Sequence, residues 1–89
     1  MLLQTFALTN RLLMKSKIDI YVIDKVREKR VAYNMSQEEL SIKAGFRSNG
    51  FVGQAESLNY NKRYNVQHIN KFAGIFDCSP KDFLPDLPV

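Results

Sequence analysis

The chain has 89 residues, a formal net charge of +4 and a composition that is 45% hydrophobic and 25% charged. These values describe one small folded domain and exclude a disordered chain or two domains. One cysteine excludes an internal disulfide, and one cysteine with one histidine excludes a zinc site of the usual Cys/His type. We therefore expect a reducing compartment such as the cytoplasm, no metal and no cofactor.

The N-terminal residues 1–14 are rich in apolar side chains, and basic residues follow them. A signal peptide has the opposite order, and polar residues make this run too broken and too short to span a bilayer. Three interpretations stay open: a helical arm that binds the domain or a protein partner, an extension upstream of a true start at Met14, or membrane association. We favour the first two, expect no membrane partner, and divide the chain into an extension, 1–17, and a domain, 18–89.

The first predicted helix of the domain runs from about residue 19 to residue 34. Val22, Val26 and Tyr33 follow helical spacing, and charged residues occupy the other side. Asp19 is expected to be its N-cap.

A short second helix begins at a capping box. In Ser36-Gln37-Glu38-Glu39, the Ser36 hydroxyl is expected to accept from the Glu39 amide while the Glu39 carboxylate reaches back. Gly45 stands where a left-handed residue would end the helix.

A third helix is predicted over residues 48–57, capped by Ser48 or Asn49. Gly50 and Gly53 lie inside it, and each costs a helix about 1 kcal/mol relative to alanine. A weak helix at such a place needs tertiary packing or close approach to another group.

The last two predicted helices cover residues 65–76 and 79–84. Asn65 is expected to cap the former, whose apolar stripe consists of Val66, Ile69, Phe72, Ala73 and Phe76. Ser79 and Pro80 mark the start of the latter. With no convincing strand, the sequence predicts an all-α, five-helix domain.

Catalysis finds little support, because no triad spacing, phosphate-binding glycine loop or metal motif is present. We expect no enzyme. Two short helices joined by a glycine turn instead indicate a helix-turn-helix, and the third helix would enter the major groove of DNA. It offers Asn49, Gly50 and Gln54 to bases, while Lys62 and Arg63 in the following loop can neutralise phosphates.

The sequence resembles the Xre / lambda-repressor-like helix-turn-helix family. The resemblance rests on residues 26–30, the block Met35-Ser36-Gln37-Glu38-Glu39-Leu40, Ala44-Gly45, Val52 and Glu56. Residues 64–66 and 78–84 resemble family members from Bacteroides-type bacteria. The resemblance implies a compact five-helix domain that binds double-stranded DNA, usually as a two-fold homodimer, and regulates transcription.

The resemblance also implies roles for individual residues. Gln37 would contact the DNA backbone, Gln54 and the first residues of the third helix would read bases, and Tyr64 would join Lys62 and Arg63 at the backbone. Arg30 and Glu56 would form a structural ion pair. The turn from Gly45 to Val52 is one residue longer than in the family, so either Arg47 or Ser48 is the extra residue, and both are candidate DNA contacts.

Glycine at positions 50 and 53 removes side chains where the family often has polar ones. This departure weakens the expectation of strong sequence specificity. The alternative is a protein–protein adaptor or antitoxin-like partner that has the same fold and binds DNA weakly or not at all.

Overall fold

The computed structural model describes residues 15–89, and this part of the chain contains helices and no strand. The elements are α2 (Lys17–Ala32), α3 (Gln37–Lys43), α4 (Phe51–Ala55), α5 (Val66–Phe76) and the 3₁₀-helix η1 (Pro80–Phe83). The predicted all-α class is confirmed over this range. The predicted fifth helix is a 3₁₀-helix of four residues, and the interpretations of residues 1–14 fall outside the described part.

Helix α2 begins earlier than its apolar pattern suggested. Ser16 is the N-cap, its hydroxyl accepts from the Asp19 amide at 3.2 Å, and the Asp19 carboxylate accepts from the Ser16 amide at 3.0 Å. Asp19 is therefore the third residue of the helix, and its prediction as N-cap was wrong. Because Ser16 starts the helix, the ordered contacts begin before residue 18, where we had placed the domain boundary.

Helix α3 begins and ends close to the predicted positions. The Ser36 hydroxyl accepts from the Glu39 amide at 3.0 Å, and Gly45 has a left-handed φ of +76°. The predicted return contact from the Glu39 carboxylate does not form, so Ser36 caps the helix without a reciprocal box. The ammonium of Lys71 on α5 also donates to the Ala44 carbonyl at 3.0 Å. The end of α3 is thus fixed both by its own glycine and by a side chain from another helix.

Helix α5 has the strongest sequence signal in the described chain. Asn65 and His68 form a reciprocal capping box, with the Asn65 side chain accepting from the His68 amide at 2.8 Å and His68 Nδ1 accepting from the Asn65 amide at 3.1 Å. Four residues of the predicted stripe are buried, but Val66 is 81% exposed. Val66 is the first residue of the helix, and it lies beyond the edge of the core.

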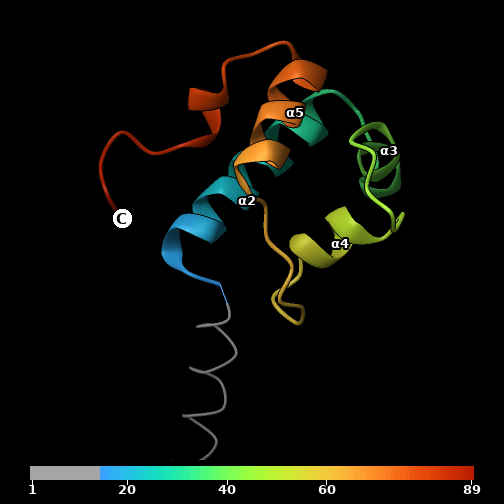
Figure 1. The fold of residues 1–89 in the computed structure, drawn as a ribbon, viewed down its shortest axis with the longest axis horizontal. Coiled ribbons are helices and arrows are strands. Elements are labelled where there is room, and N and C mark those ends of the chain that lie inside the picture. The colour runs from blue at the N-terminus through green and yellow to red at the C-terminus, as the bar shows by residue number, and fades with distance from the viewer. Residues whose placement is uncertain (1–14) are drawn as a thin grey trace, which may run out of the picture.

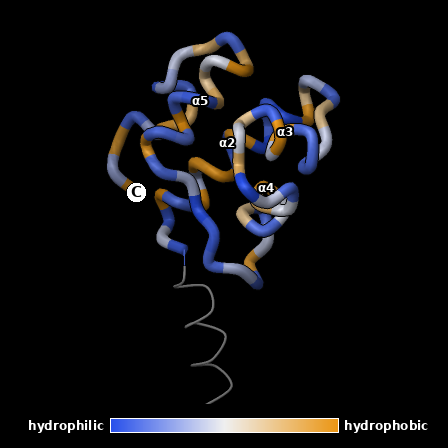
Figure 2. Tube along the Cα trace, turned by 45° about the vertical axis from the view of Figure 1, so that its right-hand side comes forward, coloured by the Kyte–Doolittle hydropathy of each residue, from blue (hydrophilic) through white to orange (hydrophobic). Residues whose placement is uncertain are grey.

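The hydrophobic core joins all five elements. Figure 1 shows α3 and α4 on one side of α2 and α5, with η1 and the C-terminal segment on the other side. Figure 2 shows hydrophilic and hydrophobic positions interleaved along the helices, as expected of helices that bury one face. The largest fully buried apolar side chains are Phe72, Phe76, Phe83, Leu40, Val26 and Val52.

Among residues 15–89, no helix combines the length and the apolar character needed to cross a membrane. The same residues hold no group of three or more His, Cys, Asp or Glu side chains suited to a metal ion. Cys78 is partly buried against the core, and burial raises the pKa of its thiol.

Candidate nucleic-acid interface

Helices α3 and α4 form a rigid unit because one buried hydroxyl joins them. Ser41 Oγ donates to the Gln37 carbonyl at 2.9 Å within α3 and accepts from the Val52 amide of α4 at 3.1 Å. Ser41 is completely buried. The hydrogen bond sets the position of the first turn of α4 relative to α3, which neither helix could do alone.

The third helix is shorter than predicted. It spans only Phe51–Ala55, and Gly50 occupies its N-cap position without a side-chain cap. The Ser48 hydroxyl accepts from the Gly50 amide at 3.1 Å, which forms a local turn in place of a helix cap. The prediction of a helix over 48–57 was therefore wrong at both ends.

The candidate DNA contacts before α4 lie in the turn that leads into it. This turn is a run of four exposed residues: Arg47, Ser48, Asn49 and Gly50. Gln54 lies on α4 itself and is half-buried. The structure thus divides the predicted base-reading residues between an exposed turn and one position on the helix.

Gly53 is the point at which α3 and α4 approach closely. A Cβ atom placed on Gly53 would lie 3.0 Å from Oε1 of Gln37. The Gln37 side chain therefore occupies space that any larger residue at position 53 would take. The close approach that this glycine permits is to a neighbouring helix of the same chain.

The predicted pair between Arg30 and Glu56 is present and bidentate. Arg30 Nε donates to Glu56 Oε2 at 2.9 Å, and its NH2 group donates to Oε1 at 2.8 Å. The side chains are only 11% and 4% exposed, respectively. Arg30 also donates to the Met35 carbonyl at 2.8 Å, so this one guanidinium ties α2 to the residue that follows α4 and to the turn before α3.

Gln37 shares the same carboxylate, which qualifies its predicted role. Its Nε2 donates to Glu56 Oε1 at 2.9 Å, although the residue remains exposed. An amide nitrogen has two hydrogens, and one of them is engaged here. Gln37 therefore has one free donor for a backbone phosphate while the other hydrogen holds its side chain in place.

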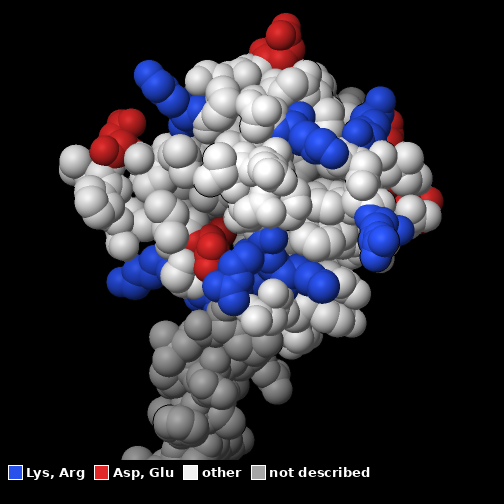
Figure 3. All heavy atoms as spheres, in the orientation of Figure 1, with Lys and Arg blue, Asp and Glu red and all other residues white. Residues whose placement is uncertain are grey.

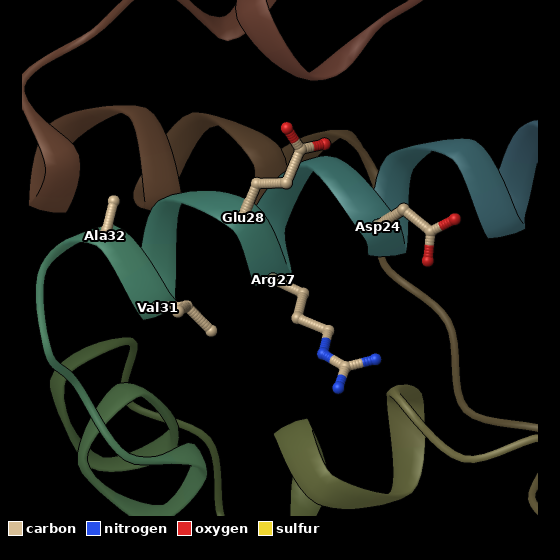
Figure 4. A pocket seen from close by; sticks show the side chains of 5 residues that line it. All are labelled: Asp24, Arg27, Glu28, Val31 and Ala32. Atoms are coloured by element: carbon tan, nitrogen blue, oxygen red, sulfur yellow. The ribbon is translucent and has the colours of Figure 1, made fainter.

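Arg27 is a candidate contact that the sequence reasoning missed. Its side chain is 62% exposed, and its Nε lies 3.8 Å from Glu56 Oε1. Figure 4 shows it extending from α2 toward α4, on the rim of an open hollow of about 560 Å³, while Glu28 points the opposite way. The available signal was its position three residues before Arg30, which places both on one face of α2.

The loop after α4 brings basic groups beside the start of that helix. Lys62 Nζ lies 5.7 Å from the centre of the Phe51 ring, in cation–π range. Arg63 is held elsewhere: it donates to Asp19 at 3.1 Å and to Asn61 at 2.6 Å. This pairing and hydrogen bonds from Ser16 outweigh the effect of burial and lower the pKa of Asp19.

Tyr64 is buried, so its prediction as a DNA contact was wrong. It is 7% exposed and belongs to an aromatic cluster with Phe46, Phe51, His68 and Phe72. Burial is the main reason that the pKa of its hydroxyl is raised. The Tyr64 ring is buried because it packs against apolar neighbours on α5 and in the turn before α4. Its place in the sequence, directly after a basic loop, did not indicate this burial.

His68 lies at the edge of this cluster and forms the helix cap described above. Its ring contacts Phe46 edge-on, with the ring centres 4.8 Å apart. Burial, followed by the nearby charge of Lys71, lowers the pKa of His68. The neutral imidazole is the form that accepts from the Asn65 amide, which fits a structural role.

On the face that Figure 3 draws, the basic groups of the described residues do not form one patch that spans the surface. Figure 3 shows Lys and Arg side chains spread over the visible face, with several adjoining in its lower part beside a carboxylate. Around α4, the exposed cations are Arg27, Arg47 and Lys62, together with Arg63 in its ion pair. This arrangement can contact several phosphates at separate points rather than one multiply charged ligand.

Comparison of the chain with protein-family models, curated proteins and solved structures gave no match.

Proposed function

We propose that the chain is a DNA-binding transcriptional regulator with a lambda-repressor-like helix-turn-helix domain, in which α3 supports α4 and α4 enters the major groove. The observation that carries this proposal is the rigid α3–α4 unit with an exposed polar turn at the start of α4. A major groove about 12 Å wide admits one α-helix. The helix must therefore project on a fixed support, which the Ser41–Val52 bond supplies.

The proposed roles of these residues follow from their chemistry. Asn49 and Gln54 have amide groups that can bond bidentately to an adenine edge. Arg47 and Lys62 have exposed cationic groups for phosphates. Arg27 is also exposed but lies 3.8 Å from the Glu56 carboxylate, and Arg63 is paired with Asp19, so a phosphate would compete with a carboxylate for either of them. Ser48 can donate to a phosphate, and Gly50 permits close approach of the backbone.

A homodimer is part of the proposal. One short helix and its preceding turn reach only a few base pairs, so useful specificity requires two half-sites. In helix-turn-helix dimers, the half-sites lie about 34 Å apart on one face of the duplex. Regulation would then depend on dimer formation or on a protein partner.

The alternative remains an adaptor with the same fold. Glycine at position 50 favours it, because this position in the exposed turn offers no side chain to a base edge. An adaptor would use the same exposed turn for contact with a protein.

The deciding experiment measures binding to a mixed-sequence fluorescent duplex at several salt concentrations. We expect micromolar affinity at low salt and a steep linear fall of log K with log salt concentration. Lys62→Ala should reduce the slope by about 1, because one phosphate contact is lost. Lys81→Ala removes an exposed charge from η1, on the opposite side of the molecule, and should leave the slope unchanged. No binding at low salt would reject DNA binding and favour the adaptor.

Base reading has a separate test, which uses a duplex selected for tight binding. Gln54→Ala should lose about 1–3 kcal/mol on the selected site and much less on the mixed sequence. An equal loss on both duplexes would show that Gln54 does not read bases.

A further inference from the structure

The ammonium of Lys15 holds the C-terminal end of α4. Lys15 Nζ lies 2.6 Å from the Ala55 carbonyl, 2.6 Å from the Ser57 carbonyl and 3.4 Å from the Gln54 carbonyl. The residue is only 4% exposed. An ammonium has three donors, and three main-chain carbonyls about 40 residues away in the sequence surround this one.

Helix α4 has a particular need for such support. It contains five residues, has no side-chain N-cap and includes Gly53. A helix this short forms few internal hydrogen bonds, and its last carbonyls have no partner within the helix. A cation at this end both donates to those carbonyls and is attracted by the negative end of the helix dipole.

The charges around Lys15 show that the carbonyls are its main partners. Burial and the positive charge of Arg63 lower the pKa of Lys15, and only Asp19 opposes them. Asp19 is itself engaged with Ser16 and Arg63. No carboxylate among the described residues forms an ion pair with Lys15, so main-chain oxygens compensate for its burial.

We propose that Lys15 is a positioning residue for the DNA-reading helix: from the segment before α2, it fixes the C-terminal end of α4 and so the angle at which the exposed turn meets DNA. This role rests on the proposed function. Lys15 acts through α4 and not on DNA, because its ammonium is buried at the end of the helix remote from residues 47–50. The chain segment that leads into α2 is thereby coupled to the candidate interface.

The test compares Lys15→Met with Lys17→Met in the full chain, on the mixed-sequence duplex. Methionine keeps the apolar stem and removes the ammonium, whereas Lys17 is exposed and serves as the charge control. We expect Lys15→Met to lose affinity on the order of tenfold, since it leaves partly buried carbonyls without a donor. The salt slope should not change. Unchanged affinity, or a slope reduced by about 1 as for a phosphate contact, would overturn the proposal.

Amide hydrogen exchange separates local positioning from general loss of stability. In Lys15→Met, we expect faster exchange at residues 54–58 and unchanged protection in α5. Equal acceleration throughout the domain would overturn the positioning role. The Lys15→Arg variant should bind DNA with an affinity close to that of the wild type, because a guanidinium also presents several donors. If Lys15→Met does not fold, Lys15→Gln, which keeps two donors, replaces it.

The two proposals fail in different ways. A wild-type chain that does not bind DNA rejects the proposed function, and exchange at residues 54–58 still decides whether Lys15 holds α4. A wild-type chain that binds DNA, with Lys15→Met equal to it in affinity and exchange, rejects only the role of Lys15.

Discussion

Helices α4 and α5 meet where the rings of Phe51 and His68 lie 5.6 Å apart, centre to centre, yet the two helices are stabilised in different ways. Helix α5 has 11 residues, a reciprocal capping box and an apolar stripe with four buried residues. Helix α4 has five residues, no side-chain cap and a glycine in its middle. Helix α5 is therefore stabilised mainly by residues of its own segment. Helix α4 is held by side chains from other parts of the chain, namely Ser41, Lys15 and Arg30.

The proposed function accounts for this difference. A helix that presents a turn and one face to a partner cannot bury that face, so it gains less from the hydrophobic effect. Its position must then come from hydrogen bonds and ion pairs with fixed geometry. Substitutions at these outside contacts should therefore affect α4 strongly, while α5 should respond to changes in its own sequence.

The largest effect is expected from Arg30→Ala. It leaves the buried Glu56 carboxylate without its bidentate partner, and removing one member of a buried pair costs about 3 kcal/mol or more. Urea unfolding at neutral pH measures the change in the free energy of unfolding. Arg27→Ala is the matched control, because its longer and exposed contact with Glu56 should contribute less than about 1 kcal/mol. Similar small losses for both variants would show that the pair does not stabilise the domain.

A smaller loss is expected from Ser41→Ala. The substitution leaves the buried Val52 amide without an acceptor, at a cost of about 1–3 kcal/mol. Ser48→Ala removes a hydroxyl of the same kind from an exposed turn and should change stability by less than about 0.5 kcal/mol. The exchange rate of the Val52 amide provides the local readout. If it stays as slow as in the wild type, the hydroxyl does not join the two helices.

The contrast between the helices also explains what could be predicted from the sequence. The hydroxyl cap at Ser36, the cap at Asn65 and the left-handed Gly45 depend on neighbours within a few residues, and all three are present. The bounds of α4 were wrong because they depend on distant groups. Ser41 and Lys15 lie outside α4 in the sequence, and no local sequence pattern indicates that either side chain forms a hydrogen bond with α4.

In the candidate site, too, some features could be predicted from the sequence and others could not. The family resemblance suggested the Arg30–Glu56 pair, and the structure contains it. Tyr64 was misplaced because burial of an aromatic ring depends on the side chains that surround it in space. Arg27 was missed because the sequence does not show that this face of α2 lies next to α4, and only that position makes Arg27 a candidate contact. The roles of Gln54, Arg47 and Lys62 at DNA remain predictions.

For α5, removal of the local cap should have a moderate effect. Asn65→Ala loses the acceptor for the His68 amide and should cost about 1 kcal/mol. Asn65→Asp keeps an acceptor at the same place and should stay within a few tenths of a kcal/mol of the wild type. Thermal and urea unfolding measure both. A loss as large for aspartate as for alanine would mean that the cap is not the stabilising feature.

The smallest effects come from a pair of identical substitutions, one in each helix. Gly74 lies within α5, and a Cβ atom there would meet nothing within 4 Å. Gly74→Ala should therefore stabilise the domain by about 0.5–1 kcal/mol, through the ordinary helix preference of alanine. In α4 the same gain is opposed, because a Cβ at Gly53 would lie 3.0 Å from Gln37 Oε1.

Gln37 can move away only by disturbing its hydrogen bond to Glu56. We therefore expect Gly53→Ala to give no net stabilisation, with the free energy of unfolding equal to that of the wild type or slightly lower. Urea unfolding of the two variants side by side measures the difference. Equal gains at both positions would show that the contact between Gln37 and α4 is loose, and that α4 follows its own helix preference as α5 does. A gain at Gly74 alone would mean that tertiary contacts, and not helix preference, decide which residue is tolerated at position 53 of α4.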